Sequence, residues 1–183
     1  MIGMSGTGYF SERNLYGVLG SLFGVVGPLI SVYILSLGEN EDIIINITEA
    51  TVWALWLSFQ GIGFYLIYQR DRDALFLFTF ILGIVAALFE ILLVLWMVDI
   101  QSEVSQLAVI SLFGIGSFSI YLILCASIMF KTSDNDYAKL AGFLLLVSAV
   151  FHMTYLAFAA GILVIANVIL RFIFSGYGTP KQQ

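Results

Sequence analysis

Long apolar runs separated by short polar segments constrain this chain more than any other feature. The clearest run, Ala74 to Val98, contains a single charged residue, Glu90. A helix needs about 20 apolar residues to cross ~30 Å of hydrocarbon, so this run is long enough to span a membrane. The whole chain is 61% hydrophobic and 10% charged, whereas a soluble domain has roughly 25% charged residues. We therefore predict an all-α, polytopic transmembrane helical bundle.

The apolar runs predict six spans in a single transmembrane domain that covers residues 1–183. The last apolar region, 140–174, would reach about 52 Å as one helix, which exceeds the thickness of a bilayer. We therefore expect a hairpin there, with its turn at 158–161. The predicted spans are 14–37, 50–69, 74–98, 104–130, 138–157 and 161–176.

The basic residues predict the orientation. With six spans, all seven Lys and Arg residues of the chain fall on one side, as the positive-inside rule favours for the cytoplasmic face. With five spans, Arg171 and Lys181 would fall on the other side. We therefore predict six spans in the plasma membrane with both termini cytoplasmic. Five spans is the alternative, because the turn expected at 158–161 contains no polar residue.

The composition argues against several kinds of site and partner. The single cysteine, Cys125, excludes an internal disulfide and a thiolate metal cluster, and the single histidine, His152, excludes bis-histidine haem. The net charge of −5 disfavours nucleic acid. We predict no cofactor and no bound metal, and the lipid bilayer is the expected partner. A membrane enzyme has the least support, because no phosphate loop or nucleophile–base pair is recognisable.

Four glycines in the first span share one helical face. Gly17, Gly20, Gly24 and Gly27 are spaced by three, four and three residues, so they lie on the same side of a helix. Small residues let membrane helices approach closely, and Pro28 is expected to kink the span. The first functional hypothesis is therefore a non-enzymatic protein that acts through helix packing, as a subunit of a membrane complex or as a homo-oligomer.

Glu90 is the strongest candidate for chemistry, because a carboxylate at hydrocarbon depth is costly unless it is neutral, paired or wetted. Counting at 1.5 Å per residue places Glu90 and His152 roughly 8–12 Å below the outer surface, with Asn167 at about the same level. We predict that these three residues form a polar layer in the outer half of the bundle. The layer either fixes helix register or exchanges protons near neutral pH. The second reading gives the alternative function, a small channel or proton-coupled transporter.

The segment 38–50 is predicted to be an acidic outer loop that includes Glu49. Within it, Asn46-Ile47-Thr48 has the form of a glycosylation sequon, and the sequence does not decide whether Asn46 is modified. The β-prone residues 43–47 predict an extended segment. Trp53 and Trp56, at the start of the second span, are expected to form an interfacial aromatic belt.

Two stretches of the chain carry a resemblance to a known family: IGFYLIYQRDRDALFLFTFILG at 62–83 and YAKLAGFLLLVSAV at 137–150. The second stretch is followed by Gly161 and by the apolar segment RFIF at 171–174. Together they resemble an uncharacterised family of small archaeal polytopic membrane proteins, in which a short charged loop precedes an apolar span. Ser148 stands where that family tends to have glycine. The resemblance covers about half of the chain. It implies a polytopic archaeal plasma-membrane protein, and it carries over neither an activity nor functional residues.

Overall fold

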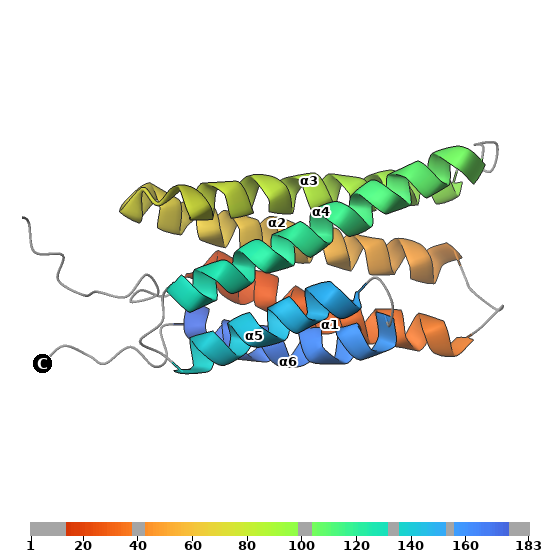
Figure 1. Ribbon diagram of the computed structural model, residues 1–183. Coiled ribbons are helices and arrows are strands. Elements are labelled where there is room, and N and C mark those ends of the chain that lie inside the picture. Colours follow the sequence, from red (N-terminus) through yellow and green to blue (C-terminus); the bar gives the residue numbers. More distant parts are fainter. Residues whose placement is uncertain (1–13, 38–42, 99–103, 132–135, 153–155, 176–183) are drawn as a thin grey trace, which may run out of the picture.

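The computed structural model describes residues 14–37, 43–98, 104–131, 136–152 and 156–175, and these residues form helices joined by short connections (Figure 1). The predicted all-α fold is confirmed over this part of the chain. The helices are α1 (Leu15–Leu37), α2 (Ile43–Asp71), α3 (Ala74–Val98), α4 (Val104–Lys131), α5 (Asp136–Phe151) and α6 (Leu156–Phe174).

The helices form a closed ring. Each helix packs against the next one in the chain, and α6 packs back against α1. Successive helices run in opposite directions, because short connections join their ends (Figure 1). A hydrogen bond of 2.8 Å from the Asn14 amide to the Phe174 carbonyl links the start of α1 to the end of α6. Large buried side chains pack inside the ring, and they include Trp56, Leu57, Phe64, Tyr121, Leu122 and Leu145.

Four helices, α1 to α4, are long and apolar enough to cross a membrane, as judged by length and composition. They mark the chain as an integral membrane protein. The two remaining helices are shorter, with 16 residues in α5 and 19 in α6. Of the six predicted spans, four therefore meet this criterion.

The second helix starts earlier than predicted. Residues 43–47 belong to α2, so the expectation of an extended segment there was wrong, and the helix takes up most of the segment 38–50 that was predicted to be a loop. A helix satisfies its own backbone hydrogen bonds, which matters most where water is scarce. The β-propensity of isoleucine is a weaker, context-dependent effect. As a result, Asn46 and Glu49 are helical residues.

The final hairpin turns earlier than predicted. The α5 helix ends at Phe151 and α6 begins at Leu156, so 158–161 is helical rather than a turn. Gly161 suggested a turn, but membrane helices commonly contain glycine. Ala159 and Ala160 are buried instead. The shift places His152 just past the end of α5, where its amide donates to the Ser148 carbonyl at 2.8 Å.

The two ends of the bundle differ in charge, because the described basic residues occur at only one end, where Asp71, Asp73 and Asp136 also lie. At the end where α1 begins and α6 ends, Lys131 of α4 pairs with Asp73 before α3 at 2.5 Å. We call this the basic end, because every described basic residue lies near it: Arg70, Arg72, Lys131, Lys139 and Arg171. The opposite end contains Glu49, with Glu90 two turns inside it, and we call it the acidic end.

Candidate functional site

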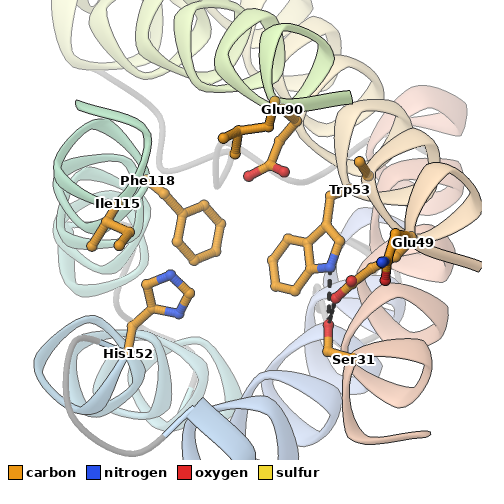
Figure 2. A pocket seen from close by; sticks show the side chains of 10 residues that line it. Ser31, Glu49, Trp53, Glu90, Ile115, Phe118 and His152 are labelled. Atoms are coloured by element: carbon orange, nitrogen blue, oxygen red, sulfur yellow. Dashed lines mark hydrogen bonds between the residues drawn. The ribbon is translucent and has the colours of Figure 1, made fainter. Parts of the chain in front are cut away.

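A cavity of about 290 Å³ lies inside the ring, toward the acidic end. Side chains from α1 to α4 and from the end of α5 converge on it (Figure 2). The lining residues are Ser31, Asn46, Glu49, Ala50, Trp53, Glu90, Leu93, Ile115, Phe118 and His152. The cavity thus combines two carboxylates and one imidazole with an aromatic and aliphatic wall.

Glu90 projects from α3 into this space (Figure 2). One turn earlier on α3, Ala86 and Ala87 are almost completely buried against the rest of the bundle, so the helix face that carries Glu90 is turned inward. Its carboxylate forms no hydrogen bond or ion pair with the described residues. A carboxylate inside a membrane bundle requires water, a proton or a cation, and the cavity provides room for each of them.

Glu49 differs from Glu90, because a short hydrogen-bonded chain holds it. The Trp53 indole N–H donates to the Ser31 hydroxyl at 3.2 Å, and that hydroxyl donates to the Glu49 carboxylate (Figure 2). Ser31 comes from α1, whereas the other two residues lie one turn apart on α2. The chain therefore fixes both a carboxylate and an aromatic ring relative to the cavity.

Aromatic rings close the cavity on the side that faces the basic end. Trp53 and Phe118 meet at 5.2 Å between ring centroids, and His152 packs on Phe118 at 4.7 Å. Trp56 lies one turn deeper on α2, contacts Trp53 and Phe118, and is fully buried. Tyr121, one turn deeper on α4, is also fully buried. The rings of Trp53, Trp56, Phe118 and His152 form what we call the aromatic floor.

The structure places two of the three predicted polar residues at the cavity. Glu90 and His152 both line it, as their similar depth suggested, whereas Asn167 does not. Since α6 begins at Leu156 rather than at 161, Asn167 lies deeper in the bundle than was expected. It is fully buried there, and its side-chain amide donates to the Leu163 carbonyl at 3.0 Å.

The glycine face packs against helices of the same chain. A Cβ atom on Gly17 would lie 2.3 Å from the Phe174 ring, and one on Gly20 would lie 2.4 Å from the backbone nitrogen of Gln60. A Cβ atom on Gly24 would lie 2.4 Å from the Asn167 side-chain oxygen. Gly27 approaches Trp53 less closely, at 3.5 Å. This face is therefore occupied by α2 and α6 and is not presented to a second copy.

Several lining residues were missed in the sequence. Glu49 was assigned to a loop and Trp53 to an interfacial belt, yet both face the interior of the ring. A signal was present, because Asn46, Glu49, Trp53 and Trp56 recur at three- and four-residue spacing, which is the period of one helix face. The predicted span began at residue 50, so it left Asn46 and Glu49 outside the helix and concealed this spacing.

The site shows no geometry for a metal centre, since no group of three or more His, Cys, Asp or Glu side chains among the described residues could hold a metal ion. No family model matches the chain, and no curated protein or solved structure matches it either. The resemblance to archaeal membrane proteins stays a prediction.

Proposed function

We propose that the protein is a small transporter of protons or other cations, with six spans and with Glu90 and His152 at its binding cavity. The observation that carries this proposal is the Glu90 carboxylate, which faces a cavity inside the bundle and has no hydrogen-bond or ion-pair partner among the described residues. The aromatic floor favours a transporter over a channel, because the cavity ends there and buried side chains fill the ring beyond it.

The charge distribution supports a cationic substrate. Two carboxylates line the cavity, and the described basic residues lie near the opposite end of the bundle. A cleft of one charge sign with low-dielectric walls raises the local concentration of oppositely charged ions. Cations are therefore the expected occupants, and anions are disfavoured.

The ring supports a topology with six spans. At 1.5 Å per residue, α5 and α6 reach about 24 Å and about 28 Å, which approaches the thickness of the hydrocarbon core. Large apolar side chains are exposed on both helices, including Phe143 and Phe172. With the basic end in the cytoplasm, both termini are cytoplasmic. A thiol tag after Gln183 would then be protected from an external reagent, whereas labelling of the tag in sealed vesicles would contradict six spans.

A role as a packing subunit or homo-oligomer lacks comparable support. Its motivation was the glycine face of α1, and α2 and α6 already cover that face. An assembly would have to use another surface.

The test of the proposed function is ion flux in proteoliposomes. We expect the wild-type protein to move protons or another cation, and Glu90→Gln to abolish or strongly reduce that flux, because the amide removes the charge and keeps the shape. Asp136→Asn is the matched control, since Asp136 is an exposed carboxylate at the basic end. A wild-type protein that moves no cation across a panel of ions and pH values would contradict the proposal.

A further inference from the structure

The cavity combines two features that recognise the same kind of ligand. Glu49 and Glu90 supply negative charge from neighbouring helices, and Trp53 and Phe118 supply aromatic surface (Figure 2). Carboxylates attract any cation. Aromatic rings add selectivity, because the ring quadrupole attracts cations that are weakly hydrated, and quaternary ammonium groups are the best-known example.

A calcium or magnesium ion fits the cavity poorly. Calcium and magnesium ions require six or more oxygen ligands at fixed short distances, and the described residues contain no group of three acidic, histidine or cysteine side chains arranged around one point. The volume of about 290 Å³ also exceeds what a single ion fills. It lies near the lower end of the range for small-molecule pockets, which is about 300 Å³.

The aromatic part of the site is held in place before any ligand arrives. Trp53 is fixed by its hydrogen bond to Ser31 and by its ring contact with Phe118. Phe118 is held in turn by Trp56 and His152. Rings that are already ordered lose little conformational entropy on binding, so this part of the cavity is preorganised.

The two carboxylates differ in what they can offer. Glu49 already accepts a hydrogen bond from Ser31, whereas Glu90 has no such partner among the described residues. His152 adds one further polar group, since its Nδ1 atom is buried without a hydrogen-bond partner in the described part of the chain. Glu90 is therefore the residue whose charge is most in need of a counter-ion.

We propose that the cavity binds a small organic ammonium ion, with its charge beside Glu90 and its alkyl groups against Trp53 and Phe118. This inference rests on the proposed function, because it names the substrate class of the same cavity. The ammonium group could belong to a free solute or to a lipid headgroup, since the recognition chemistry is the same for both.

The experiment measures binding to the full-length protein in nanodiscs of phosphatidylglycerol, a lipid without an ammonium group. The probes are methylammonium, tetramethylammonium and choline, and the uncharged control is 3,3-dimethylbutan-1-ol, which has the shape of choline without its charge. We expect saturable binding of at least one ammonium probe and none of the alcohol. Adding phosphatidylcholine distinguishes the two sources, because a lipid headgroup that occupies the cavity would compete with the free probe.

Two variants assign the binding to this cavity. Glu90→Gln should weaken ammonium binding by about tenfold or more, which corresponds to the loss of a charge-assisted contact. Trp53→Leu should weaken it by a smaller factor, and Trp53→Phe should restore part of the loss because a ring is retained. Asp136→Asn should leave the affinity unchanged. If a variant is not monodisperse, Ser31→Cys takes its place, and binding is measured as the protection that an ammonium probe gives the introduced cysteine against a thiol reagent.

The outcomes separate this inference from the proposed function. If no ammonium probe binds at millimolar concentration, or if the alcohol binds equally well, the inference is wrong, even when Glu90→Gln still abolishes proton flux. If ammonium binds and depends on Glu90 but no cation crosses the vesicle membrane, the binding site stands and the transport proposal falls.

Discussion

The inward face of α1 has two halves that are built from the same kind of residue and behave differently. Toward the basic end, Gly17, Gly20 and Gly24 bring α1 so close to its neighbours that an added methyl group would overlap them. Toward the acidic end, Gly27 has only ordinary contacts at 3.5 Å, and Ser31 faces the cavity. Pro28 lies in the second half. One helix therefore seals the bundle at one end and borders a cavity at the other.

The comparison shows what small residues contribute in each place. Where three helices meet tightly, glycine lets backbones approach, and van der Waals contact supplies the association that lipid cannot drive. Where the helices are further apart, Ser31 donates a hydrogen bond to the Glu49 carboxylate beside the cavity. Sequence spacing alone cannot distinguish the halves, because the difference lies in the neighbours.

The largest expected effect is at the sealed half. Gly20→Ala would place a methyl group 2.4 Å from the Gln60 amide nitrogen, which is backbone and cannot rotate away. We expect destabilisation of about 1–3 kcal/mol from overpacking, or failure to fold. Thermal unfolding in detergent measures it, with Gly116→Ala as the control, because a Cβ atom there meets nothing within 4 Å. Equal melting temperatures for the two variants would show that α1 and α2 are further apart than described.

An intermediate effect is expected at Ser31. Ser31→Ala removes the hydroxyl that joins Trp53 to Glu49. We therefore expect the free energy of unfolding to fall by about 0.5–1.5 kcal/mol, and the cation flux and the affinity for the ammonium probes to fall as well. Ser21→Ala is the control on the same helix, because the Ser21 hydroxyl bonds only to the Gly17 carbonyl among the described contacts. Flux and ligand binding should fall for Ser31→Ala and stay unchanged for Ser21→Ala. A loss of flux and binding in Ser21→Ala but not in Ser31→Ala would show that the tightly packed half of α1, and not the half beside the cavity, supports function.

The smallest effect is expected at Gly27. A methyl group there would make ordinary contacts with Trp53 and Val52, so Gly27→Ala should change the free energy of unfolding by no more than about 0.5 kcal/mol. The same detergent unfolding experiment checks it beside Gly20→Ala. A large destabilisation by Gly27→Ala would remove the distinction between the two halves.

Much of the fold could be predicted from the sequence. The lengths of the apolar runs predict the helices, and the positions of the basic residues indicate which helix ends lie together. The register of Glu90 and His152 also followed from counting. Asn167 did not, since the prediction depended on where α6 begins, and no turn residue marks that point. Glu49 and Trp53 were missed because the β-prone residues before them hid the start of α2. The partners of the glycine face depend on which helix closes the ring, which spacing does not reveal.

The central claim is that α1 packs tightly toward the basic end and borders a cavity toward the acidic end. The most direct test compares the reactivity of two cysteines that replace serines, one in each half. Ser21 and Ser31 are both buried, and both hydroxyls lie within hydrogen-bonding distance of the carbonyl four residues earlier. In a Cys125→Ser background, a membrane-impermeant cationic thiol reagent is applied to the reconstituted protein. The account predicts that Ser31→Cys reacts, and faster with this reagent than with an anionic one, while Ser21→Cys is protected from both. Equal protection of the two cysteines, or faster reaction at position 21, would contradict it.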